Sequence, residues 1–270
     1  MKKSILITGA TDGIGLATAK MLVLQGHQVL LHGRNPNKLE QVKKTLSEIA
    51  GNGRLESYLA DLSLMSDVEA LAKAVTEKHR KLDVLINNAG VYQAPAVITQ
   101  DGLDIRFAVN TLAPYLLTKD LMPLLGKSAR VINLSSAAQA PVNLEALAGT
   151  VKLSDAAAYA QSKLALTAWS RTMAISQQGQ GPAIIAVNPG SMLGSKMVKQ
   201  AFSVTGGDIQ IGAKILALAA VDDQFSDAGG LYFDNDHGRF ASPHPDVLDR
   251  QKSEAIVRAI DTLVADINRH

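Results

Sequence analysis

Short apolar runs alternate with longer amphipathic segments from the start of the chain to about position 233, and few architectures accommodate such a pattern. Seven runs are turn-bounded and strand-like, at 4–8, 28–32, 54–60, 82–88, 130–136, 183–189 and 230–234. Periodic segments of helical length separate them, at about 14–26, 36–49, 66–79, 103–125, 155–177 and 209–220. This alternation predicts right-handed βαβ units. We therefore expect an α/β fold, with a doubly wound, Rossmann-like parallel sheet of about seven strands and helices on both faces.

The 270 residues contain no linker or internal repeat, so we expect one domain over residues 1–270. A loop at 235–245 should precede a C-terminal helix at 246–268. The net charge of +2 is dispersed, which indicates no nucleic-acid partner. Without cysteine, the chain has no disulfide and no thiolate nucleophile. No run reaches the roughly 20 apolar residues of a membrane span, and the N-terminal run is short for a signal peptide. These features predict a cytoplasmic protein.

Three glycines, Gly9, Gly13 and Gly15, follow the first strand in TGATDGIG and open the first helix. Glycine lets the backbone turn sharply and approach a pyrophosphate, whose charge the helix N-terminus attracts. This context predicts dinucleotide binding, and the alternative is a βα turn without a ligand. The spacing is G-x-x-x-G-x-G, and not the G-x-G-x-x-G of many dehydrogenases.

The end of the second strand should lie over the adenosine ribose of the cofactor. Gly33 stands where a carboxylate would bind the ribose of NAD(H), and Arg34 follows. A guanidinium pairs with phosphate in a fork geometry, so the sequence favours NADP(H) over NAD(H). In the alternative interpretation Arg34 is a solvated loop residue. Lys38 is a weaker candidate for the phosphate.

Seven local patterns occur in a single order: TGATDGIG, Asp61-Leu62, NNAG at 87–90, AVN ending at Asn110, INLSS, YAQSK at 159–163 and NPG at 188–190. In this order the sequence resembles the short-chain dehydrogenase/reductase family over at least residues 4–195. The long segment between Ser136 and Tyr159 is similar to the branch with retinol-dehydrogenase-like enzymes. The resemblance implies hydride transfer between NADP(H) and a carbonyl or alcohol carbon.

The resemblance also implies four catalytic residues. Tyr159 is the expected acid/base, and Lys163, one helical turn later, should lower its pKa and reach the nicotinamide ribose. Ser136 should hold the substrate oxygen, with Ser135 as the alternative. Asn110 should hold a water that links the lysine to solvent. A polar asparagine has poor propensity for the helix interior in which it is expected.

The resemblance implies a larger set of residues that contact the cofactor. These are Gly9, Thr11, Asp12, Gly13, Ile14, Gly15, Arg34, Asp61, Leu62, Asn88, Ala89, Gly90, Tyr159, Lys163, Pro189, Gly190 and Ser191. Asp61 should accept from the adenine amino group with Leu62 near the ring, although Asp61 also fits a helix cap. Asn87 is expected to tie neighbouring strands. Ser195 lies one position from the family threonine that contacts the carboxamide.

Residues 191–208 follow the sixth strand and include Met192, Leu193 and Met197, so they are expected to cover a small apolar or amphipathic substrate. Alternatively, these side chains pack on the core. The sequence shows no metal-ligand spacing. A homodimer or homotetramer could form through 103–125 and 155–177. The competing function is a non-catalytic NADP(H)-sensing protein. A nucleotide-sugar epimerase fits less well, because only about 35 residues follow the last strand.

Overall fold

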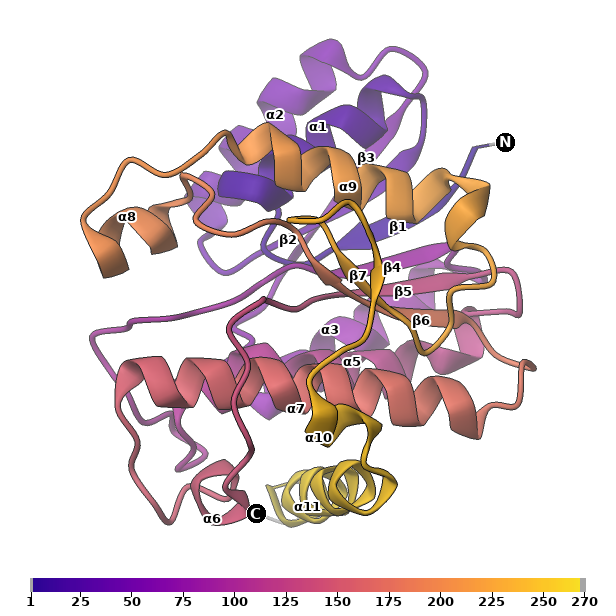
Figure 1. The fold of residues 1–270 in the computed structure, drawn as a ribbon. Helices are drawn as coiled ribbons and strands as arrows, with labels where there is room; N and C mark the ends of the chain where they lie inside the picture. Colours follow the sequence, from indigo (N-terminus) through magenta and orange to yellow (C-terminus); the bar gives the residue numbers. More distant parts are fainter. Residues whose placement is uncertain (1, 268–270) are drawn as a thin grey trace.

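The computed structural model describes residues 2–267, apart from the side chain of residue 202, and shows one sheet with helices on both faces (Figure 1). Its eight strands are β1 Ser4–Ile7, β2 Gln28–Gly33, β3 Arg54–Leu59, β4 Val84–Asn87, β5 Arg130–Leu134, β6 Ala183–Asn188, β7 Tyr232–Asp234 and β8 Arg239–Ala241. Their order is β3-β2-β1-β4-β5-β6-β7-β8. The first seven strands are parallel, and β8 is antiparallel to β7. The predicted doubly wound α/β fold is confirmed.

Helices connect the strands and cover both faces. They are α1 Gly13–Leu24, α2 Pro36–Ile49, α3 Met65–Lys78, α4 Ile105–Phe107, α5 Ala113–Leu121, α6 Leu144–Leu147, α7 Asp155–Ser176, α8 Lys196–Phe202, α9 Ile209–Val221, α10 Pro245–Leu248 and α11 Arg250–Ile267. A π-helical turn, η1 (Ala108–Leu112), joins α4 to α5, and the 3₁₀ turns η2 (Met122–Leu124) and η3 (Asp223–Phe225) follow α5 and α9.

The pleat of the central strand divides the core in two. Leu6 of β1 belongs to the cluster beneath α3, α5 and α7, whereas Ile5 and Ile7 belong to the cluster beneath α1, α2 and α9. All three side chains are fully buried, as expected for a parallel sheet covered on both faces. The chain winds outward in opposite directions from β1, so its switch point lies between β1 and β4. Ligands of such sheets bind at the carboxyl ends of the strands at this point.

Two elements differ from the sequence prediction. The expected loop at 235–245 contains β8, which pairs with β7 as a hairpin, with Phe233 and Phe240 in edge-to-face contact at 5.1 Å. The expected continuous helix at 103–125 is instead divided into α4, η1, α5 and η2. Pro114 explains part of this break, because it has no N–H to donate to the carbonyl of Asn110 in an α-helix.

Two further segments differ from the sequence prediction: one contains an additional helix, and the other contains two helices where one was expected. Residues 191–208 contain the short helix α8, with Leu193 paired to Gly207 beside it. The expected helix at 246–268 is divided into α10 and α11, and residue 268 lies outside the described residues.

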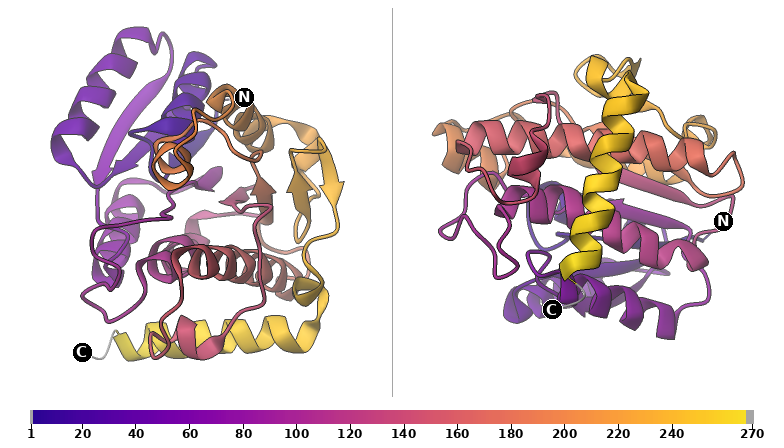
Figure 2. Two further views of the ribbon diagram at one scale, coloured as in Figure 1. Left: turned by 60° about the vertical axis from the view of Figure 1, so that its left-hand side comes forward. Right: turned by 90° about the horizontal axis from the view of Figure 1, so that it is seen from below.

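The C-terminal helix α11 crosses α7 on the outer side of the molecule (Figure 2). Its apolar residues Ile256, Ile260 and Val264 recur at helical spacing and are buried. Asp261 accepts hydrogen bonds from the Tyr115 hydroxyl and from Lys119 Nζ, both at 2.9 Å. The helices expected to contact a second copy are therefore partly covered by the chain itself. Within residues 2–267, none of the helices combines the length and apolarity needed to span a membrane.

Candidate active site

The glycine turn lies between β1 and α1 and is built around positive φ angles. Gly9 and Gly13 have φ angles of +64° and +52°, which residues with a Cβ rarely adopt. A Cβ on Gly15 would lie 2.3 Å from the carbonyl oxygen of Gly9, so this contact requires glycine. Asp12 caps α1 by accepting from the N–H of Gly13 at 2.8 Å. The first-turn N–H groups that follow, those of Ile14 and Gly15, have no intrahelical acceptor.

Residues after β4 hold the glycine turn in place through hydrogen bonds. Asn88 donates through Nδ2 to the carbonyl oxygens of Thr8 and Gly9, at 2.9 and 3.1 Å. The Ala89 N–H donates to the Thr8 hydroxyl at 3.1 Å. The side-chain amide of Asn88, which was expected to contact the cofactor, therefore donates to the glycine turn. Asn87 links β4 to β5 through Asn133 Oδ1 at 2.8 Å, in agreement with its expected structural role.

The end of β2 is crowded by a neighbouring side chain. A Cβ on Gly33 would lie 2.5 Å from Thr11 Cγ2, so any side chain there would displace this methyl group. Arg34 is exposed, and Lys38 forms an ion pair with Asp12 at 2.6 Å. The hydrogen bond with Lys38 lowers the pKa of Asp12.

Asp61 and Leu62 follow β3, whose end lies beside the end of β2 at the carboxyl edge of the sheet. Asp61 Oδ1 accepts from the N–H and hydroxyl of Ser63, at 3.0 and 2.8 Å, in a turn that precedes α3. Leu62 is buried in the core. His32, which was not predicted from the sequence, lies between these segments. Its ring accepts from the Gly9 N–H at Nδ1 (3.2 Å) and contacts the Ala60 carbonyl at Nε2 (3.1 Å). Burial lowers the pKa of His32 to about 4, so the ring is neutral and joins the glycine turn to β3.

Tyr159 and Ser136 come together from α7 and the end of β5. The Ser136 hydroxyl lies close enough to the Tyr159 phenol to lower the pKa of that phenol. Ser135 points elsewhere and shares a bond of 2.6 Å with the Thr167 hydroxyl in the interior. Between the two serines, only Ser136 therefore reaches Tyr159. The Ala138 N–H donates to Ser136 Oγ at 3.1 Å, which leaves the serine O–H for another acceptor.

Lys163 lies beneath Tyr159 on the next turn of α7. Its Nζ is 5.7 Å from the centre of the tyrosine ring and donates to the Leu134 carbonyl at 2.6 Å. Burial lowers the pKa of Lys163 to about 7. Burial raises the pKa of Tyr159, and the hydrogen bond with Ser136 offsets only part of that rise. The expected lowering of the Tyr159 pKa is therefore wrong for this structure, because burial outweighs a lysine that is itself only partly charged at neutral pH.

Asn110 lies in the π-helical turn η1 and is fixed on both sides. Its side chain accepts from the Val91 N–H at 2.8 Å and donates to the Val91 carbonyl at 2.9 Å. Its Nδ2 also donates to the Ser162 hydroxyl at 3.0 Å, and that hydroxyl donates to the Tyr159 carbonyl at 2.7 Å. The side chain thus links the loop after β4 to α7.

Gly90 marks the point at which these groups converge. A Cβ on this residue would lie 3.4 Å from Asn110 Oδ1, 3.6 Å from Lys163 Nζ and 3.7 Å from Met197 Cε. The loop after β4, η1, α7 and α8 therefore meet around one small space. Any side chain at position 90 would narrow it.

The loop after β6 approaches from the other side. Asp236 of the β7–β8 turn accepts from the N–H and hydroxyl of Ser191, at 2.7 and 2.6 Å. Asn235 Nδ2 donates to the Pro189 carbonyl at 2.8 Å. Gly190 has a φ of +118°. Ser195 caps α8 by accepting from the Val198 N–H, so its hydroxyl has a local structural partner.

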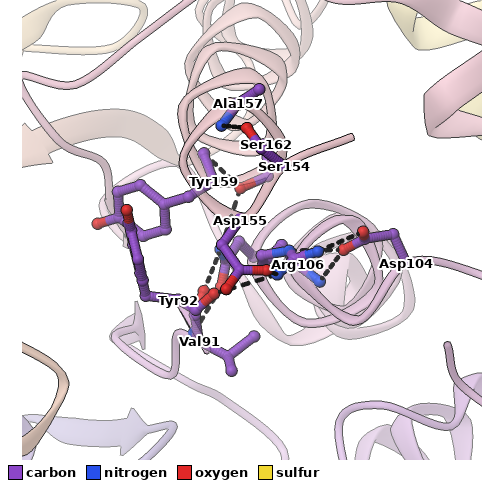
Figure 3. A network of polar contacts seen from close by, with 10 residues as sticks. Val91, Tyr92, Asp104, Arg106, Ser154, Asp155, Ala157, Tyr159 and Ser162 are labelled. Carbon is purple, nitrogen blue, oxygen red and sulfur yellow. Dashed lines mark hydrogen bonds and ion pairs between the residues drawn. The ribbon is translucent and has the colours of Figure 1, made fainter. Parts of the chain in front are cut away.

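Two residues near the site were missed because neither belongs to a motif. Tyr92, two residues after Gly90, lies against Tyr159 with ring centres 5.0 Å apart (Figure 3). Arg106 is fully buried and pairs with Asp104 and Asp155. An aromatic residue two positions after NNAG is a signal for the first, whereas an arginine in a helical pattern normally indicates an exposed position.

Comparison with known proteins identifies the family to which this arrangement belongs. The model of the short chain dehydrogenase family matches residues 3–206. The chain belongs to this family. The family predicted from the motif order is confirmed, and similar relatives include retinol dehydrogenases. Mouse (Mus musculus) retinol dehydrogenase 13 is 31% identical over 268 residues, which cover 92% of this chain and 80% of that protein.

A further relative and two solved structures are also similar to this chain. Human (Homo sapiens) polyprenol dehydrogenase is 34% identical over 252 residues, covering 86% of this chain and 76% of that protein. The solved structure of the Escherichia coli oxidoreductase yciK has a TM-score of 0.70 at 26% identity, with 86% and 94% covered. A short chain dehydrogenase from Escherichia coli CFT073, solved with NADPH, has the same TM-score and identity, with 86% and 96% covered.

Proposed function

We propose that this protein transfers a hydride between NADP(H) and a carbonyl or alcohol carbon of a small apolar or amphipathic substrate. The observation that carries the proposal is the convergence of Ser136, Tyr159 and the buried Lys163, whose Nζ lies 5.7 Å from the centre of the tyrosine ring. When bound, the nicotinamide supplies or accepts the hydride. The protein must then hold the substrate oxygen and move one proton.

The four catalytic residues have separate roles in this proposal. Tyr159 donates its phenolic proton to the oxygen during carbonyl reduction and accepts it during alcohol oxidation. Ser136 donates to the same oxygen and stabilises its developing charge. Lys163 lies beneath the ring and donates to the ribose. Asn110 fixes the loop after β4 against α7, and its carbonyl is the expected site of the water that connects Lys163 with solvent.

The residues present fit a dinucleotide. Gly13 and Gly90 have no backbone atom within 3.4 Å of where a Cβ would stand, so both leave space for a ligand to approach. The free first-turn N–H groups of α1 suit a pyrophosphate. Asp61 and Leu62 would lie at the adenine, and Pro189, Gly190 and Ser191 at the nicotinamide.

The choice of NADP(H) over NAD(H) rests on the end of β2. Gly33 offers no carboxylate to the ribose, Thr11 Cγ2 crowds this position, and the exposed Arg34 is available to pair with a 2′-phosphate. Lys38 can also pair with the 2′-phosphate, because its ion pair with Asp12 holds it beside the glycine turn. The NADPH in the E. coli relative agrees with this preference.

The substrate class follows from residues 191–208 and from the relatives. Met192 is exposed and Met197 lies beside Gly90, so α8 and its flanks supply an apolar cover for the substrate. Retinol and polyprenol dehydrogenases are relatives, so retinal and short polyprenals are the first carbonyl compounds to test.

The test is a screen for NADPH oxidation with these aldehydes and a panel of aliphatic and aromatic ketones. Tyr159→Phe is the inactive variant, and Tyr58→Phe, on β3, is the matched control. We expect turnover in the wild type and in Tyr58→Phe only. NADPH binding without turnover on any member of the panel would favour the non-catalytic NADP(H)-sensing function instead.

A further inference from the structure

Arg106 is a fully buried cation beside the active site, and it holds two carboxylates and a carbonyl (Figure 3). Its Nε and Nη2 donate to the two oxygens of Asp104, at 2.8 and 2.6 Å. Its Nη1 donates to the carboxylate of Asp155 and to the Tyr92 carbonyl, the latter at 3.3 Å. Four donor–acceptor contacts therefore fix the guanidinium in one orientation.

Stability alone is a weak reason for such a group. Removing an arginine from water carries a penalty that the attraction of its partners often only balances, and apolar residues can replace buried ion pairs without loss. A geometric role is the alternative, because the planar fork of arginine fixes the relative positions of its partners.

Each segment that Arg106 joins carries a residue of the proposed site. Tyr92 follows Val91, which Asn110 holds by both backbone groups. Arg106 itself precedes Asn110 by one helical turn. Asp155 is the first residue of α7 and precedes Tyr159 by one turn.

The contact between Tyr92 and Tyr159 lies directly beyond this ion pair. The two ring planes are inclined at 53°, and Figure 3 shows the rings beside each other on the side of the network away from Asp104. Moving the start of α7 relative to the Tyr92 backbone would therefore move the Tyr159 ring.

We propose that Arg106 is a positioning residue, which acts with Asp104 and Asp155 to fix the first turn of α7 against the loop after β4 and thereby places Tyr159 for proton transfer. The inference rests on the proposed function, because it assigns Tyr159 that role. A displacement of about 1 Å at a reacting group can reduce a rate by as much as 100-fold.

The decisive variant is Asp155→Ala, because this carboxylate is half-exposed and its loss leaves Arg106 paired with Asp104. Asp155→Asn keeps an oxygen acceptor and should recover part of the rate. Asp246→Ala is the matched control, since Asp246 is also an ion-paired first-turn carboxylate, on α10. Rates are expressed per NADPH-binding site, which corrects for any unfolded fraction.

We expect Asp155→Ala to lower kcat by about tenfold or more, with KM and NADPH affinity changed by about twofold at most. Asp155→Asn should lie between it and the wild type, and Asp246→Ala should match the wild type. Arg106→Lys, which keeps the charge without the fork, should resemble Asp155→Ala. Crystal structures should show the Tyr159 ring displaced in both variants relative to Asn110.

Three results would overturn the inference: a kcat within twofold of wild type in Asp155→Ala, a rise in KM that accounts for the whole loss, or an undisplaced Tyr159 ring. If the wild type reduces no carbonyl compound, the proposed function fails, and the ring position in the crystal structures still decides whether Arg106 positions Tyr159.

Discussion

The ammonium of Lys163 lies 5.7 Å from the centre of the Tyr159 ring, and it donates to the carbonyl oxygen of Leu134 rather than to a carboxylate. A buried ammonium with only a carbonyl partner is poorly compensated for lost hydration. Burial accordingly lowers the pKa of Lys163 to about 7 and raises that of Tyr159. The proposed acid and its neighbouring cation are thus held in a state that favours the uncharged form of both.

The first prediction concerns Tyr159. Replacing it with phenylalanine keeps the ring and removes the proton, so we expect carbonyl reduction to fall by roughly 10²- to 10⁴-fold. NADPH affinity, measured by fluorescence titration, should stay near that of the wild type. A variant that retained more than about a tenth of the activity would show that the proton comes from another group.

A second prediction concerns the stability of the protein without cofactor. The folded pKa of Lys163, about 7, lies below its ordinary 10.5, so the unfolded chain binds more protons between these values. The lysine therefore destabilises the fold fully below pH 7, and the penalty disappears as the pH approaches 10.5. Lys163→Met should raise the free energy of unfolding by about 2 kcal/mol at pH 6, after loss of the bond to Leu134 is included.

Urea unfolding of the Lys163→Met variant and the wild type at pH 6 and pH 9 gives this comparison. The advantage of methionine should shrink at the higher pH. An advantage that grew with pH would contradict the direction of the pKa shift. Lys20→Met, at an exposed position of α1, is the control for loss of a lysine charge.

Cofactor choice is tested at Arg34. Because this guanidinium is proposed to pair with the 2′-phosphate, Arg34→Ala should weaken NADPH binding by about tenfold or more. NADH affinity should change by less than about twofold, since NADH has no such phosphate. Fluorescence titration of both cofactors measures the ratio. Arg54→Ala, an exposed arginine of β3, is the control, and equal losses for both cofactors would reject the pairing.

The position of α11 leads to a prediction about assembly. The helix covers part of α7 and pairs Asp261 with Tyr115 and Lys119 of α5. A second copy could not reach this covered face without displacing α11. We expect light scattering to give the mass of one chain, 28.6 kDa. A stable dimer would indicate an interface elsewhere or release of α11.

Much of the fold follows from patterns that are local in sequence. The strand runs, the glycine turn and each single motif depend on residues within a few positions of one another, and the predicted strands and turn match the structure. The β7–β8 hairpin was missed because β8 has three residues and its stability comes from the distant pairing of Phe240 with Phe225 and Phe233.

The site shows the same limit. Ser136 and Tyr159 could be chosen from the sequence because both belong to motifs. The direction of the Tyr159 pKa shift could not be predicted, because the burial that raises this pKa depends on the whole fold. Arg106 gave no signal, because Asp155 lies 49 residues away and nothing local indicates that it converges on Arg106 and the neighbouring Asp104. The hydrogen bonds from Asn110 to the Ser162 hydroxyl, and from that hydroxyl to the Tyr159 carbonyl, could likewise not be predicted without the positions of η1 and α7.

The π-helical turn at Ala108–Leu112 has a consequence for the kinds of mutation that the protein can accept. A π turn contains one residue more than the α turn it replaces, so a single-codon deletion there would restore a regular helix. The residues on one side of the deletion would then rotate by about 100° relative to those on the other, and Asn110 would turn away from either Val91 or Ser162. Surface loops tolerate insertions and deletions of one residue. Within these five positions, we expect such a change to abolish function.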